Sequence, residues 1–185
     1  MIRHRISVIL CCIVLCAGGA LPARADLKAG MKAYQQKDYA AAMREFKADG
    51  KAQANYNISV MYYRGEGVQQ DKNEAAKWLR KAAEQGHPLA EFTLGAIYFT
   101  GDGVEQNPSE GVKWLRKSAE KGYDEAQFRL GVMYVNGDHI EKDRKEGVKW
   151  LKKAARQGHV NAIKLLKVMG ESQPVLKGHP GASGH

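Results

Sequence analysis

Apolar residues recur along this chain at helical spacing, in two kinds of segment that alternate. In the first kind, Ala90, Leu94 and Ile97 fall on one side of a helix. In the second kind, Ala75 and Leu79 begin a stripe of the same spacing. The alternation predicts an all-helical chain built from helix pairs.

Start and stop signals mark the ends of these helices. Asn107 is a polar N-cap, Pro108 takes the first helical position, and Glu110 stands where a capping box places its acid. Gly101 follows the preceding helix at the position of a C-terminal glycine. The other two copies of the second helix start in the same way, at Asp71 with Glu74 and at Asp143 with Glu146.

The whole pattern repeats every 36 residues, as the spacing of Trp78, Trp114 and Trp150 illustrates. Shifting residues 87–122 onto 123–158 matches 17 of 36 positions without a gap. A single helix pair cannot bury its apolar face, so neighbouring pairs must stack into a solenoid. We therefore expect a degenerate N-terminal hairpin (26–50), three repeats (51–86, 87–122 and 123–158), a capping helix (159–170) and a disordered tail (171–185).

The first 25 residues have the pattern of a secretory signal. A basic start at Arg3 and Arg5 precedes an apolar stretch, which ends in a small-x-small cleavage pattern. The sequence predicts cleavage between Ala25 and Asp26, with no transmembrane span afterwards. We therefore expect an exported protein, periplasmic or secreted.

Removal of this segment changes the available chemistry. All three cysteines lie within it, so the mature chain contains no disulfide, thiol nucleophile or cysteine metal ligand. The segment also holds three arginines and no acid, so its removal takes the net charge from +9 to +6. A basic chain favours contact with anionic surfaces.

The strings AEFTLGAIYFTGDGV and EGVKWLRKSAEKG resemble the two halves of a Sel-one-like repeat, a relative of the tetratricopeptide repeat. The resemblance covers about residues 51–170. It implies a right-handed αα superhelix whose concave surface binds proteins or peptides, and exported members often serve in bacterial envelope signalling, motility or host contact. His139 stands where Gly67 and Gly103 sit, so the third loop cannot share their strained backbone conformation without an energetic cost.

Nothing in the sequence indicates catalysis. The chain has no nucleophile–base signature, Walker loop, zinc-protease motif or dinucleotide fingerprint. His87 and His159 are expected to be loop or surface residues rather than ligands, and His139 is kept as a candidate ligand. We predict no enzymatic activity, no cofactor and no metal, and we expect the recurring tryptophans to pack in the core rather than to stack a ligand.

Three rows of residues on the first helices are candidates for partner binding. By analogy with tetratricopeptide helices these rows face the concave groove, where an apolar strip can take a helix or an extended segment. Packing against the neighbouring helix explains the same rows equally well. The nine candidates are Tyr56, Phe92 and Phe128, then Val60, Ala96 and Val132, then Tyr63, Phe99 and Val135.

Lysines recur on the second helices and are expected on the convex face. A solvated helix surface explains them without any partner. The six positions are Lys77, Lys81, Lys113, Lys117, Lys149 and Lys153. The leading hypothesis is thus a non-enzymatic envelope scaffold that binds a protein or peptide in its groove. The alternative is an electrostatic binder of anionic envelope material, and no motif suggests nucleic acid.

Overall fold

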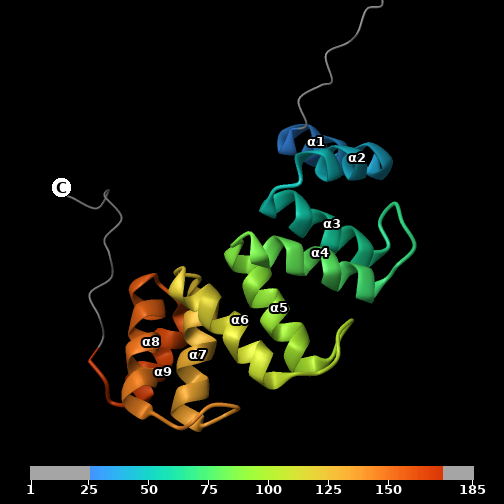
Figure 1. The fold of residues 1–185 in the computed structure, drawn as a ribbon. Helices are drawn as coiled ribbons and strands as arrows, with labels where there is room; N and C mark the ends of the chain where they lie inside the picture. The colour runs from blue at the N-terminus through green and yellow to red at the C-terminus, as the bar shows by residue number, and fades with distance from the viewer. Residues whose placement is uncertain (1–25, 173–185) are drawn as a thin grey trace, which may run out of the picture.

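The computed structural model describes residues 26–172, and every regular element in that range is a helix (Figure 1). The predicted signal segment, Ala25 included, and residues 173–185 of the predicted tail lie outside the described residues. The helices are α1 (Leu27–Gln35), α2 (Tyr39–Asp49), α3 (Ala52–Arg64), α4 (Lys72–Glu84), α5 (Pro88–Thr100), α6 (Pro108–Glu120), α7 (Asp124–Asn136), α8 (Arg144–Arg156) and α9 (Val160–Val168).

Each helix packs against the next one along the chain, so the molecule grows from one end to the other. The pairs α3/α4, α5/α6 and α7/α8 follow each other in an arc, with the α1/α2 pair at one end and α9 at the other (Figure 1). The prediction of an all-helical αα solenoid is confirmed.

The buried core lies at the junctions between repeats. Leu79 of α4 packs with Leu94 of α5 in one cluster, and Leu151 of α8 packs with Leu166 of α9 in another. The α2/α3 and α6/α7 junctions hold the corresponding clusters. A helix pair therefore relies on the next pair to cover its apolar face.

Side-chain caps fix where the second helices begin. The side chains of Asp71, Asn107 and Asp143 accept the backbone N–H three residues later, at 2.9, 3.1 and 2.9 Å. These bonds satisfy donors that the helix itself leaves free. The predicted polar caps are confirmed.

The acid of the predicted capping box has a different role. The N–H of Asn107 donates to the carbonyl oxygen of Tyr98 at 2.9 Å, so this donor is already taken. The Glu110 carboxylate instead accepts from Lys113 Nζ at 2.5 Å. Helices α4 and α8 begin in the same way. The capping-box prediction was wrong because the preceding helix supplies the acceptor.

The chain just after α9 is tied back to α8. Glu171, which the sequence places in the tail, contacts Lys152 at 3.2 Å and Arg144 at 3.8 Å. Its backbone N–H also donates to the carbonyl oxygen of Leu166. The ordered structure therefore extends beyond the end that we expect from the sequence.

Candidate partner-binding groove

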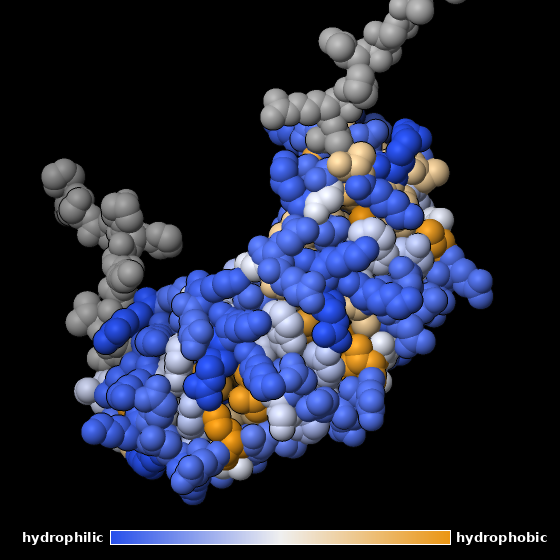
Figure 2. All heavy atoms as spheres, in the orientation of Figure 1, coloured by the Kyte–Doolittle hydropathy of each residue, from blue (hydrophilic) through white to orange (hydrophobic). Residues whose placement is uncertain are grey.

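The nine candidate groove positions lie on α3, α5 and α7, and none belongs to the fully buried core. Tyr63 is 47% exposed and Ala96 is also exposed, while the other seven are half-buried. Most of the molecular face in Figure 2 is hydrophilic, with small apolar patches, one of them over α7. Half-buried apolar rows of this kind leave surface that a partner can cover.

Two clefts follow these rows. The first, of about 330 Å³, is lined by Tyr56, Val60 and Tyr63 together with side chains of α4 and α5. The second, of about 890 Å³, lies along α5 and α7. Its candidate residues are Phe92, Ala96, Phe99, Phe128 and Val132.

Val135 is the candidate that lines neither cleft. Its Cγ2 atom lies 2.7 Å from the place that a Cβ atom on Gly147 would take. Val135 therefore packs between α7 and α8, as the alternative explanation of its row requires. Phe99 makes a similar contact with Gly111, but its ring still borders the second cleft.

The aromatic row at the start of the first helices joins neighbouring repeats. Each ring packs against the residue that stands just before the first helix of the following repeat, or before α9 at the end. One side of the ring therefore contacts the next repeat, and only the other side borders a cleft. The pairs are Tyr56 with His87, Phe92 with Tyr123 and Phe128 with His159, with ring centroids 5.1, 5.2 and 4.6 Å apart.

His87 also caps α5, a role that the sequence analysis missed. Its Nδ1 accepts the N–H of Ala90 at 3.2 Å, and its Nε2 lies 2.8 Å from Gln53 Oε1. The ring is therefore neutral, with its proton on Nε2. Burial lowers the pKa of His87, although the charge of Glu91 opposes this. The position just before Pro88 was the available signal.

One charged network stands at the edge of the second cleft. Glu125 accepts from Arg129 Nε at 2.7 Å and lies 2.9 Å from His159 Nε2. Burial raises the pKa of Glu125, but the hydrogen bonds from His159 and Arg129 outweigh it, so the pKa is lowered. The Arg129 guanidinium also lies 5.4 Å from the ring centroid of Phe92. Glu125 therefore already has hydrogen-bond partners in Arg129 and His159.

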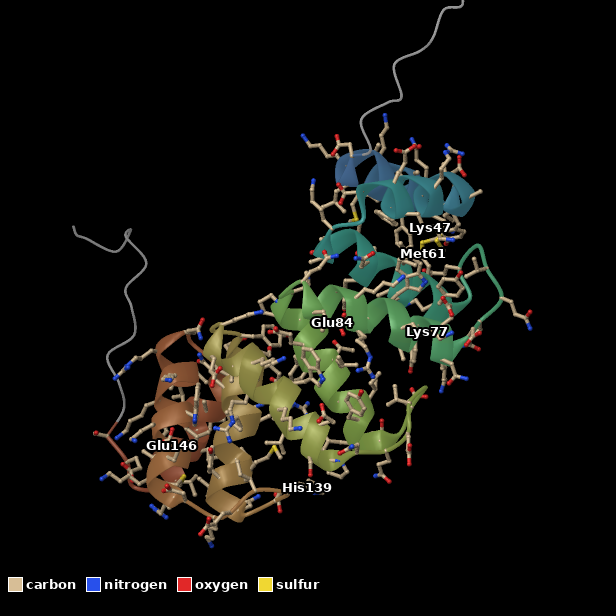
Figure 3. The ribbon with its side chains drawn as sticks, viewed as in Figure 1. Lys47, Met61, Lys77, Glu84, His139 and Glu146 are labelled. Carbon is tan, nitrogen blue, oxygen red and sulfur yellow. The ribbon has the colours of Figure 1, made fainter. Side chains whose placement is uncertain are left out.

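His139 occupies the loop after α7 (Figure 3). Its φ is +55°, close to the +73° of Gly67 and the +78° of Gly103. The third loop therefore shares this conformation with a residue other than glycine, which carries the cost expected from the sequence. The His139 ring stacks on Phe99, with centroids 5.5 Å apart, and this contact helps to offset a strain on the order of 1 kcal/mol.

The predicted basic lysines are exposed on α4, α6 and α8 (Figure 3 marks Lys77), but each of them contacts either a carboxylate or an aromatic ring. The hydrogen bond to Glu74, at 2.9 Å, raises the pKa of Lys77. Lys113 and Lys149 pair in the same way, with Glu110 and Glu146. The other three lie over tryptophan rings, Lys81 on Trp78, Lys117 on Trp114 and Lys153 on Trp150, at 3.8, 3.9 and 3.6 Å.

These contacts also place the tryptophans. Trp114 and Trp150 are buried and join core clusters, and Trp78 packs against another. Because a lysine covers the outer side of each ring, the rings form no open platform for a ligand. They pack as core residues, as the sequence predicts.

The described part of the chain shows neither a metal-binding cluster nor a membrane-spanning helix. Between residues 26 and 172 no group of three or more histidine, aspartate or glutamate side chains is placed to hold a metal ion. In the same range no helix has the length and apolar character that a membrane span needs.

Comparison with known proteins agrees with the repeat pattern. The Sel1 repeat model matches residues 52–87, 88–123 and 124–159, each one residue later than the repeats expected from the sequence. Among curated proteins, none matches the chain.

Several solved structures are similar. A Sel1 repeat protein from Oxalobacter formigenes is 34% identical, with a TM-score of 0.72 over 80% of this chain and 64% of its own. A protective antigen of uropathogenic Escherichia coli, c5321, which displays an SLR fold, is 37% identical, with a TM-score of 0.72 over 77% of this chain and 32% of its own. Cysteine rich protein B of Helicobacter pylori shares the fold at 22% identity, with a TM-score of 0.53 over 80% of this chain and 99% of its own.

This chain thus spans less than two thirds of the first two relatives, and its likeness to them concerns the repeats. The helix pairs, the junction cores and the three matched segments agree with one another. The chain belongs to the Sel1 repeat family.

Proposed function

We propose that this protein is an exported, non-enzymatic scaffold of the bacterial cell envelope that binds a protein or peptide in the groove along α3, α5 and α7. The observation that carries the proposal is the pair of clefts, which eight of the nine candidate positions line. Sel1 repeat solenoids generally serve protein–protein interaction and are typically non-catalytic scaffolds, which supports the same function.

The chemistry of the clefts suits a peptide segment. Their walls are apolar, with aromatic rings held in place by neighbouring repeats, so little side-chain freedom is lost when a partner binds. Charged groups stand at their edges, where they can fix the orientation of a polar backbone.

Export is the part of the proposal that rests on the sequence. Cleavage between Ala25 and Asp26 leaves Asp26 in place as the N-cap of α1, where its carboxylate accepts the N–H of Lys28 at 3.0 Å. The predicted processing therefore preserves the first folded element. Mass spectrometry of the protein from its own cells tests the cleavage site, and an N-terminus elsewhere contradicts it.

Tyr63 and Ala96 are the positions to test for groove binding, because both are exposed. Phe99, another of the nine candidate positions, also packs on Gly111, so its truncation changes stability as well. We expect Tyr63→Ala combined with Ala96→Glu to release the partner while the midpoint of thermal unfolding stays nearly unchanged. Ser109→Glu adds the same charge on α6, outside both clefts, and is the matched control.

The experiment is a pull-down with the tagged full chain from its own cell envelope, washed at low and high salt. A discrete protein that resists high salt, is retained by the Ser109 variant and is lost with the double variant supports groove binding. Apolar burial survives salt, whereas exposed charge contacts are screened. Anionic material that is lost at high salt from every variant contradicts the groove and favours the lysine face.

A further inference from the structure

The two clefts are equivalent by the 36-residue repeat, but their charged edges differ. In the first cleft Asp102 forms an ion pair with Lys72, 2.8 Å apart, and this pair raises the pKa of Lys72. Asp138 is the equivalent residue of the second cleft, and Pro108 stands at the position of Lys72. The second cleft therefore keeps the carboxylate but has no cation at the position of Lys72.

Asp138 has no replacement cation in the described part of the chain. Its Oδ2 accepts from the amide of Asn136 at 3.1 Å, and within residues 26–172 no lysine, arginine or histidine forms an ion pair with it. Of the bases that line the cleft, Arg129 is paired with Glu125, and the ring of His139 stacks on Phe99. His159, which lies outside the lining, is also engaged by Glu125. Asp138 thus stands at the edge of an apolar cleft, and within residues 26–172 no ion pair neutralises its carboxylate.

The second cleft is also the larger, at about 890 Å³ against 330 Å³. Ala96 replaces Val60 and Thr100 replaces Arg64 on its α5 wall, so the side chains there are smaller. The second cleft therefore has more room for a side chain of a partner.

The third loop, which bounds this cleft, also helps to make the cleft wider. A Cβ atom on Gly103 would collide with the backbone of Lys72, so the second loop lies directly against α4. His139 carries a Cβ atom at the equivalent position with a similar φ. The third loop cannot make the same close approach, and Gly137, Asp138 and His139 all line the cleft.

We propose that the second cleft binds a partner segment in which a bulky apolar side chain stands next to a lysine or arginine. The apolar side chain lies against Phe128 and Val132, and the cation pairs with Asp138 as Lys72 pairs with Asp102. This inference rests on the proposed groove function and names the chemistry of the partner.

The probes are three short synthetic peptides that differ at one position, Phe-Lys, Phe-Gln and Phe-Glu, each within the same neutral flanks. Binding is followed by amide chemical shifts of the isotope-labelled protein, expressed as the full chain. We expect the Phe-Lys peptide to move the amides of Ala96, Phe128 and Asn161 and to bind about 2- to 5-fold more tightly than Phe-Gln, since exposed ion pairs contribute little more. Phe-Glu should bind most weakly.

Two variants isolate the role of the carboxylate. Asp138→Asn should abolish the preference for lysine, and it disturbs little because Asp138 is exposed. Pro108→Lys restores the residue of the first repeat, so its lysine should pair with Asp138 and reduce Phe-Lys binding to the Phe-Gln level. Lys72→Gln frees Asp102 and should create a lysine preference in the first cleft.

The outcomes separate this inference from the proposed function. Equal binding of Phe-Lys and Phe-Gln in the cleft overturns the charge inference but leaves groove binding in place. A lysine preference that persists in Asp138→Asn also overturns the charge inference and leaves groove binding in place. Failure of all three peptides to move groove amides overturns the inference, and shifts confined to the lysine face of α4, α6 and α8 count against the proposed function as well.

Discussion

Single positions of the repeat carry different residues for the same structural task. His87 and His159 each cap a helix through Nδ1 and stack a ring on the preceding repeat. Tyr123, at the same position, supplies the ring contact without a side-chain cap. An imidazole is flat and also accepts a hydrogen bond, so it performs both tasks only while Nδ1 is unprotonated.

This requirement makes stability depend on pH. The folded-state pKa of His87 lies below its ordinary value of 6.5, so the unfolded chain takes up a proton first as pH falls. The contribution of His87 is complete above pH 6.5 and is lost as pH falls through the folded pKa. We expect His87→Asn, which still caps the helix, to show a smaller loss of thermal stability between pH 8 and pH 5.

Unfolding midpoints of the two proteins across this range check the prediction. The two proteins differ only at position 87, so the difference between the curves reports His87. Parallel curves for the wild type and His87→Asn contradict it.

At the scale of the element, each second helix begins with two polar residues whose roles differ. The amide oxygen of Asn107 accepts a backbone N–H of α6, whereas Glu110 pairs with Lys113 on the surface. A cap to a free backbone donor contributes more than an exposed pair on a helix.

The cost of removing each group should follow this difference. We expect Asn107→Ala to lower the free energy of unfolding by about 1 kcal/mol, and Asn107→Asp to restore most of it. Glu110→Ala should cost only about 0.3 kcal/mol. Urea unfolding measures all three, and equal losses at the two positions indicate that Glu110 acts as a capping-box acid after all.

At the scale of the whole molecule, stability resides in the junctions between repeats. Leu94 is fully buried at a central junction, and Leu166 is fully buried at the last one, where α9 covers α8. Each junction joins only neighbouring elements. A destabilising substitution at the centre should therefore affect helices on both sides of it, whereas one at the end should affect mainly the last helices.

Hydrogen–deuterium exchange tests this directly. Leu94→Ala should cost about 2–5 kcal/mol and speed exchange in helices on both sides of the centre. Leu166→Ala should speed exchange mainly in α8 and α9. Val168→Ala, on the same helix but 85% exposed, is the control and should change little. Uniformly faster exchange in both leucine variants is evidence against nearest-neighbour coupling.

Much of the architecture was predictable because its signals are local. Helical periodicity, caps such as Asn107 and the recurrence of Trp114 every 36 residues depend only on the order of residues. The candidate groove rows followed by analogy, and eight of the nine positions line a cleft. Val135 does not, because the glycine that it packs against lies on another helix.

The tertiary structure decided how the polar groups are paired. Whether Glu110 serves a cap or a lysine depended on the carbonyl group that Tyr98 brings to Asn107. The sequence by itself determined the helices, their number per repeat and their stacking, because these follow from spacing along the chain. Only the stacked structure decided that Asp102 meets Lys72 and that Asp138 meets no cation, because partners some 30 residues apart are brought together by packing alone.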